Sequence, residues 1–399
     1  MTEFKKTSGW SKGANNLAQN KRVPDGFVRH ALNVDATPDG ILTSRVGYEQ
    51  LYAGTAVRGV LALGTKLLVA DGTDLVEVDQ SGGSRILRTI AGAGQFVGAE
   101  LNGVLYFSTA DECLKYDGLN VTPWGVPDVL YQPALAVGDG ALVPGHYQVA
   151  MTLVSPDGLE GGTDLPAIIK VAAGGISVTV PAVPSGYTAR IYVSSVDGST
   201  VYLQHATNTA GIVNIGAVRD DTARCQTILL RAPRPATRIV NHNALLVMVE
   251  GRTVWWTLPM QSHLVDRAKG FVQYPEDVGE IGSDGALFVS ADKCYALTNV
   301  ETGDIAQETV LEFPAYSGTG VALPDGRFAW MTRYGQAISD GGKMNLVNAG
   351  SFVPTTAVAG AAGVVDYNGS QTIITSTRGS TGSNSMAAAD YFLGEIINQ

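Results

Sequence analysis

The chain has 399 residues, of which 45% are hydrophobic and only 16% are charged, and its formal net charge is -10 at pH 7. A chain of this length can bury more than one core. Because gripping nucleic acid or an anionic membrane requires clustered Lys and Arg, the acidic balance argues against a surface built for that task. It still allows an acidic wall along which DNA slides without being held.

The 48 glycines and the scarcity of helical periodicity indicate an all-β protein rich in tight turns. No apolar run reaches about eighteen residues, and polar residues follow the first six, so we expect no membrane anchor and no secretory signal. We therefore expect the protein to be made in a cytoplasm. Cys113, Cys225 and Cys294 have no metal-like spacing. Cys113 and Cys294 fall at equivalent places in two repeats, so we predict that both are small buried side chains rather than ligands or a disulfide.

The first segment, residues 1–26, is polar and rich in Gly and Asn, which predicts an extended arm without a core of its own. Two apolar-alternating strands then flank the turn residues 37–40, Thr-Pro-Asp-Gly. Proline presets φ in such a turn and glycine tolerates a positive φ. The first part of the main domain therefore begins near residue 27.

From there a short phrase recurs: a Gly, Asn or Asp turn, an apolar-alternating strand, a second tight turn and a second strand. Its first strands contain Leu67, Leu105, Leu245, Leu287 and Phe328. The steps between these residues are 38, 140, 42 and 41 positions. A period of about forty residues made of short strands is typical of the blades of a β-propeller. The long step equals one period plus an insert of about one hundred residues, which is the size of a β-sandwich.

We place this insert at residues 127–235, between propeller segments 27–126 and 236–377. Strands recur inside it about every ten residues, with turn signals between them, as in a small sandwich. The pattern resembles a fibronectin type III or immunoglobulin-like module.

An open propeller would expose sheet edges that invite pairing with other chains. We therefore expect the strand pair near 28–48 and the pair near 364–376 to complete one shared blade. The N- and C-terminal strands would thus close a propeller of about five to six blades. Residues 378–399 are rich in Gly, Ser and Ala and predict a flexible tail.

Catalytic patterns are missing from the sequence. No Gly-x-Ser-x-Gly elbow, His-Glu-x-x-His pair or phosphate-binding loop occurs, and no histidine lies in a recognisable catalytic phrase. The residues 241–243 that surround His242 look like a turn. We predict that the protein is not an enzyme and has no catalytic, metal-binding or cofactor-binding residue. The histidines are His30, His146, His205, His242 and His263.

Two alternatives remain open. A propeller glycosidase would need two carboxylates about 5–9 Å apart. A carbohydrate-binding adhesin would use the insert, or Trp255 and Trp256, as its contact. Most candidate acids precede glycine in turns, where Asp is favoured for its backbone hydrogen bonds, so we predict turn roles for them. These acids are Asp71, Asp74, Asp284, Asp292 and Asp325.

The N-terminal fifty residues carry the most specific pattern. An arm with Gly and paired Asn (13–17) precedes Ala-x-Asn-Val-Asp (31–35) and then Gly-x-Leu-x-x-Arg-x-Gly (40–47). This order resembles the opening of tailed-bacteriophage virion proteins, and the tail nozzle and tail hub proteins of short-tailed phages in particular. Later stretches, from 271–276 to 320–326, also look similar to such proteins.

The resemblance implies a structural subunit of a phage tail, located in the virion and made in the host cytoplasm. It implies a ring of about six copies around a channel that DNA crosses without specific binding. Its partners would be other copies of itself, a tail adaptor on the portal side, and tail fibre or other tail proteins. Segments that cannot fold alone are expected to contact neighbouring subunits. The residues expected to make these contacts are Trp10, Asn15, Asn16, Phe392, Leu393, Ile396 and Ile397.

Overall fold

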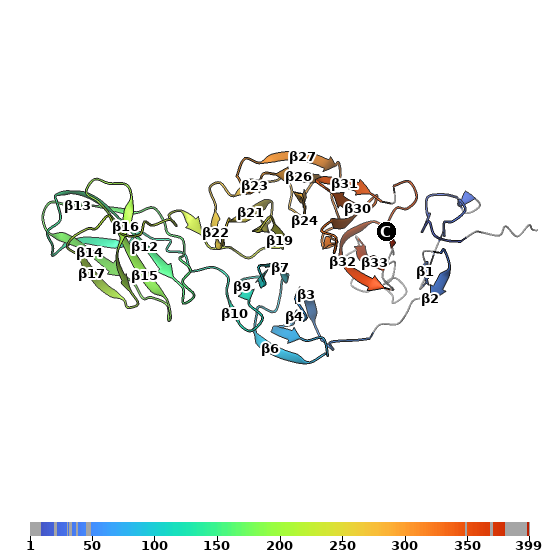
Figure 1. Cartoon of the computed structure of the whole chain (residues 1–399), viewed down its shortest axis with the longest axis horizontal. Helices are drawn as coiled ribbons and strands as arrows, with labels where there is room; N and C mark the ends of the chain where they lie inside the picture. The colour runs from blue at the N-terminus through green and yellow to red at the C-terminus, as the bar shows by residue number, and fades with distance from the viewer. Residues whose placement is uncertain are drawn as a thin grey trace, which may run out of the picture. The chain divides into compact units, whose positions relative to one another are not determined.

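A computed structural model shows an all-β chain (Figure 1). It describes residues 9–19, 22–29, 31, 34–36, 39–44, 49–347, 349–367, 370–379 and 397–398. No helix in these ranges is long and apolar enough to cross a membrane. The chain divides into two compact units. Unit 1 comprises Met1–Ala53, Val249–Thr253 and Gln273–Gln399, and unit 2 comprises Gly54–Met248 and Val254–Val272.

Unit 2 begins with two four-stranded antiparallel sheets whose strands pair in chain order. The first contains β3 (Val57–Leu63), β4 (Lys66–Asp71), β5 (Asp74–Val78) and β6 (Ser84–Thr89). The second contains β7 (Val97–Leu101), β8 (Val104–Ser108), β9 (Cys113–Tyr116) and β10 (Val121–Pro123). Asn102 and Gly103 join β7 to β8, and both have a positive φ, of 53° and 75°. Asn-Gly suits this two-residue hairpin turn, whose twist matches that of the strands.

A third sheet is larger. Its strands are β19 (Arg238–His242), β20 (Leu245–Glu250), β21 (Thr253–Leu258) and β22 (Gln261–Asp266). The short strands β18 (Leu230–Arg231) and β23 (Phe271–Gln273) add to it, beside β22 and β21 respectively. Strand β20 is buried at five of its six residues, as expected for an inner strand with both faces covered.

Unit 1 holds two more four-stranded meanders. One consists of β24 (Glu280–Asp284), β25 (Ala286–Ser290), β26 (Cys294–Thr298) and β27 (Ala306–Leu311). The other consists of β28 (Val321–Ala322), β29 (Phe328–Thr332), β30 (Gly335–Asp340) and β31 (Lys343–Leu346). The two sheets share a core that includes Phe288, Phe328 and Trp330.

Up-and-down sheets of four sequential strands are the blades of a β-propeller. The predicted repeat is confirmed strand by strand, because every repeat residue lies on the second of the four main strands of its sheet. These residues are Leu67 on β4, Leu105 on β8, Leu245 on β20, Leu287 on β25 and Phe328 on β29.

The inserted residues form two antiparallel sheets. One contains β11 (Ala134–Gly138), β14 (Gly175–Val180) and β17 (Gly211–Ile215). The other contains β12 (Gly145–Val154), β13 (Ala167–Val171), β15 (Thr188–Ser194) and β16 (Val201–Thr207). Both contribute to one core, for example through Ile176, Val149 and Ile191. The domain bounds 127–235 and the likeness to a fibronectin type III module stay predictions.

The predicted shared terminal blade is wrong for the strands that the structure describes. Strands β1 (Val34–Ala36) and β2 (Leu42–Ser44) form a separate two-stranded sheet. Strands β32 (Ala357–Tyr367) and β33 (Ser370–Gly379) pair with each other, and β34 (Ile397–Asn398) adds to β33. The backbone of Ser317 bonds to Gly360 on the outer side of β32. Other segments therefore pair with a part of each outer edge of the hairpin.

The same strands correct the predicted tail. Residues 378 and 379 end β33, and 397 and 398 form β34, so part of the segment expected to be flexible has regular structure. Residues 380–396 lie outside the described ranges.

Candidate functional site

A network of hydrogen bonds connects the insert to the blade sheets at their junction in unit 2. Three backbone segments run side by side there, around residues 129, 163 and 228. The amide of Val129 donates to the carbonyl of Gly162 at 3.0 Å, and the amide of Leu229 donates to that of Thr163 at 2.8 Å. The chain then continues into β18, which pairs with β22. The end of the insert is thus itself a strand of a blade sheet.

Glycine makes this close approach possible. A Cβ atom added at Gly162 would lie 1.9 Å from the carbonyl oxygen of Leu230, far inside any real contact. The backbone amide of Ala232 donates to the carboxylate of Asp128 at 2.8 Å. This bond joins the end of the insert to its beginning. Burial raises the pKa of Asp128.

Glu160 organises the side chains at this junction. Its carboxylate accepts hydrogen bonds from Thr152 Oγ1 and Tyr192 Oη, both at 2.6 Å, and from Arg190 Nη1 at 2.9 Å. Thr152 lies on β12, while Arg190 and Tyr192 lie two residues apart on the same face of β15. Burial, and next the hydrogen bond to Glu160, raise the pKa of Tyr192, which keeps the phenol protonated as a donor.

Two contacts tie this part of the insert to the blade sheets. His263 on β22 bonds through Nε2 to the backbone oxygen of Glu160 at 3.2 Å. Lys115 on β9 forms an ion pair with Asp157 at 2.5 Å. Burial lowers the pKa of His263, which is only 8% exposed. The turn between Asp157 and Glu160 is thus held from two different blade sheets, by β9 and by β22.

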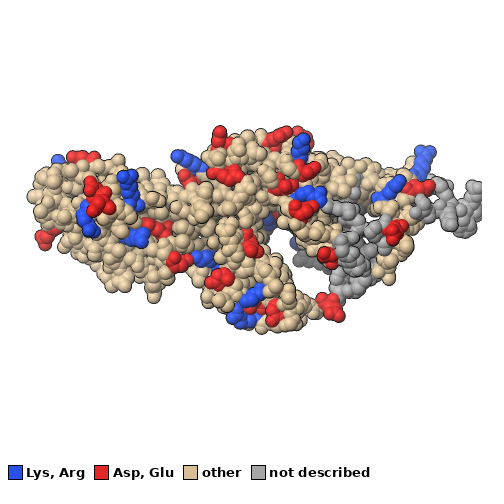
Figure 2. Space-filling model, viewed as in Figure 1, with Lys and Arg blue, Asp and Glu red and all other residues tan. Residues whose placement is uncertain are grey.

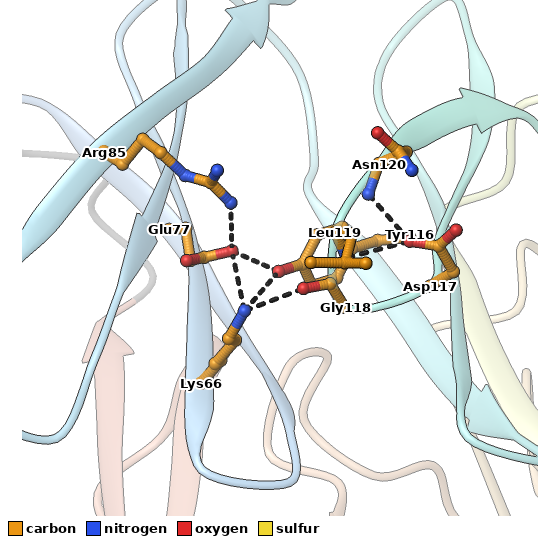
Figure 3. Close-up of polar contacts among 8 residues, drawn as sticks. All are labelled: Lys66, Glu77, Arg85, Tyr116, Asp117, Gly118, Leu119 and Asn120. Carbon is orange, nitrogen blue, oxygen red and sulfur yellow. Dashed lines mark hydrogen bonds and ion pairs between the residues drawn. The ribbon is translucent and has the colours of Figure 1, made fainter.

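A second polar cluster joins the first two blade sheets (Figure 3). Glu77 on β5 accepts a short hydrogen bond from Tyr116 on β9 and one from Arg85 at 2.9 Å. Lys66 donates to the carbonyl of Gly118 at 2.7 Å and lies 3.4 Å from Glu77. Burial acts to raise the pKa of Glu77, but the hydrogen bonds from Tyr116, Arg85 and Lys66 outweigh it and lower that pKa. This cluster acts as a structural link between blades.

Asp325 shows the predicted turn role, because it bonds the backbone two residues further on. The bonds of Asp71 and Asp284 reach residues 15 and 55 positions away, and that of Asp292 goes to a side-chain hydroxyl, so these differ from the prediction. Asp71 accepts from the backbone amide of Ala56 at 2.6 Å, and Asp325 accepts from that of Arg327 at 3.1 Å. Asp284 accepts from Ser339 Oγ at 2.6 Å, and Asp292 accepts from the Tyr295 hydroxyl at 2.9 Å. Among the described residues, no group of three or more His, Cys, Asp or Glu side chains is arranged to hold a metal ion.

The histidines are dispersed. His146 is exposed and lies 3.4 Å from Asp197, and His205 is exposed on β16. His242 is not in a turn as predicted, because it is the last residue of β19 and is 1% exposed. His263 belongs to the junction, and His30 lies outside the described ranges.

The cysteines are free thiols. Cys113 and Cys294 each begin the third strand of a blade sheet, as the repeat predicts. Cys113 is half-buried rather than buried as predicted. Cys294 is fully buried, and burial raises its pKa to about 12.

The N-terminal residues proposed for subunit contacts make bonds within their own chain. Asn16 donates through Nδ2 to the carbonyl of Val353 at 2.7 Å and accepts from its amide at 3.0 Å. Asn15 is 7% exposed, and the amide of Trp10 donates to Gly40. A contact with a neighbouring subunit stays a prediction for all of them. Ile397 pairs through its backbone with Ile373, and Phe392, Leu393 and Ile396 lie outside the described ranges.

On the face drawn in Figure 2, blue and red side chains are scattered among tan residues.

The sequence alone does not predict the role of Glu160 at this junction. The available signal was the pair Gly161 and Gly162 directly after an acid between strand-like segments, which marks a close backbone approach rather than a phosphate loop.

No protein-family model matches the chain, and no curated protein matches it. Among solved structures, it is similar to a streptogramin B lyase at 14% identity, covering 80% of this chain and 90% of that one with a TM-score of 0.34. It is also similar to a virginiamycin B lyase from Staphylococcus aureus (9% identity, 81% and 92% covered, TM-score 0.32). A third is apo AztD from Citrobacter koseri (13% identity, 79% and 91% covered, TM-score 0.28). Likeness at this level carries no conclusion about the function of this chain.

Proposed function

We propose that the chain is a structural subunit of a bacteriophage tail, of the nozzle or hub type, and has no catalytic activity. Copies assemble into a ring around the DNA channel, with about six copies expected. The ring contacts a tail adaptor on one side and tail fibre or other tail proteins through the insert. DNA passes through during ejection without specific binding, since the net charge of -10 disfavours a tight grip on phosphate.

The observation that supports this proposal best is the junction at Glu160 and β18. A module joined by a free linker would move independently of its body, as is usual for small interdomain contacts. Here the insert is bonded to blade strands through β18, His263 and Lys115. A rigid projection suits a part that must hold a fixed position against another protein in a large particle.

The N-terminal sequence pattern supplies the second support, since it is the part that resembles phage tail proteins. Residues 13–16 of that pattern are ordered by backbone and side-chain bonds to residues 28 and 351–353.

Negative-stain electron microscopy of the purified full chain tests the proposal. We expect class averages that show closed rings of one diameter, without added partner. Scattered single particles at tens of micromolar protein would contradict it. A preparation of the Glu160→Ala variant serves as a comparison, because a loosened insert should leave the ring but blur the density outside it.

A further inference from the structure

The hairpin between β29 and β30 presents two exposed residues, Arg333 and Tyr334, at its tip. Thr332 is fully buried beneath them. Its hydroxyl donates to the carbonyl of Gly335 at 2.8 Å and accepts from the amide of Tyr334 at 3.1 Å. These two bonds fix the backbone of the tip, so the two exposed side chains are attached to a backbone with a fixed conformation.

The side chains at the tip stack on one another. The guanidinium of Arg333 lies 4.9 Å from the ring centroid of Tyr334 and 5.7 Å from that of Phe313. The two rings are themselves in edge-to-face contact, with centroids 4.6 Å apart. A guanidinium that stacks on aromatic faces keeps the N–H donors around its rim available for hydrogen bonds. We call these three residues the Arg333 pad.

The donors of the pad have no protein acceptor within the described residues. The interactions of Arg333 there are the two ring contacts alone, with no hydrogen bond and no ion pair. Glu312, the residue before Phe313, forms an ion pair with Lys293 at 2.5 Å. Tyr334 is 45% exposed, so an apolar surface lies open beside the unused charge.

We propose that the Arg333 pad binds an Asp or Glu carboxylate from a second copy of this chain. An arginine fork donates two parallel hydrogen bonds to a carboxylate, and prior stacking reduces the side-chain ordering that binding requires. Tyr and Arg are also the residue types that dominate the energy of protein interfaces.

Charge balance favours this occupant. The chain carries 37 acidic residues against 27 basic ones, so every further copy offers carboxylates in excess. In a ring built head to tail, one surface of each copy meets a different surface of the next, which allows a basic pad to face an acidic one. The inference rests on the proposed ring and names one contact within it.

The test compares three variants of the full chain by sedimentation velocity over a concentration series. Arg333→Ala should weaken self-association about ten- to a hundredfold, because it removes a charge-assisted pair. Arg333→Lys keeps the charge but not the fork, so a smaller loss is expected. Lys343→Ala is the matched control, since it removes one exposed positive charge from β31 of the same sheet without touching a ring. Its association constant should stay within about twofold of that of the wild type.

The outcomes separate the two proposals. If the wild type forms rings and Arg333→Ala forms them equally well, the pad is not an interface and the inference fails while the ring stands. If the wild type stays monomeric, both fail. If Arg333→Ala assembles normally but loses binding to acidic glycans on an array, the carboxylate belongs to a saccharide and the second copy is the wrong occupant. Equal melting temperatures for wild type and variants confirm that each protein is folded.

Discussion

Replacing Glu160 by alanine is the most direct perturbation of the insert. Its carboxylate accepts from Thr152, Arg190 and Tyr192, and the first and last of these residues are 0% and 1% exposed. Without Glu160, two buried hydroxyl donors lose their acceptor, and each unsatisfied donor costs about 1–3 kcal/mol of stability. Arg190 keeps partial access to water, since its side chain is 34% exposed. The variant should therefore lose about 3–5 kcal/mol of insert stability.

Two companion variants calibrate this value. Glu160→Gln retains one oxygen for Thr152 and Tyr192 but turns an amide nitrogen toward Arg190, so a loss of about 1–2 kcal/mol is expected. Asp157→Ala removes the ion pair with Lys115, whose carboxylate side is 49% exposed. An exposed pair contributes less than about 1 kcal/mol.

Hydrogen exchange read by mass spectrometry measures the change where it occurs. Peptides from β12 and β15 report the opening free energy of the insert, and peptides from β25 and β29 in unit 1 report a distant reference. We expect the protection of β12 and β15 to be highest in the wild type and to fall in the order Asp157→Ala, Glu160→Gln, Glu160→Ala. The protection of β25 and β29 should not change. Equal protection in Glu160→Ala and Asp157→Ala would refute the role given to Glu160.

Three further predictions concern single residues of the fold. Met260 is 97% exposed at a hairpin turn with a φ of 60°, so Met260→Gly should raise the free energy of unfolding by about 1 kcal/mol; a lower urea midpoint would contradict this. Burial lowers the pKa of His263, so the unfolded chain takes up the proton first as pH falls, and stability should drop below about pH 6.5. His263→Gln should show a smaller loss between about pH 7.5 and 5.5, and equal losses would exclude this cause. Cys294, with a pKa of about 12 and no exposure, should resist iodoacetamide at about pH 8 until urea unfolds the chain; peptide mapping that finds it alkylated in the folded protein would contradict this.

The blade strands could be predicted because their signals are local. Turn residues such as Asn102 and Gly103 and alternating apolar side chains define each hairpin within about twelve residues. Leu67, Leu105, Leu245, Leu287 and Phe328 therefore occupy equivalent strands in the structure.

Pairing between the chain ends could not be predicted in the same way. An exposed edge can be covered by any segment that reaches it, and here Ser317 and β34 lie against the β32–β33 hairpin. The two asparagines that flank His242 predict a turn there, whereas the turn uses Asn243 and Ala244, both at positive φ.

The polar junction is equally non-local. Thr152 is eight residues from Glu160, but Tyr192 and His263 are 32 and 103 residues away. The registers of β12, β15 and β22 bring these side chains to Glu160. A charge, a hydroxyl and an imidazole each look like ordinary surface residues until those registers are known.

The mass of the purified full chain in solution tests the central claim most directly. Mass photometry should show one dominant species at a fixed multiple of the 41.7 kDa chain, with about six copies expected if the proposed tail-nozzle role is right. A population that remains at the mass of one chain across the whole concentration range would contradict the assembly of this protein into a tail ring.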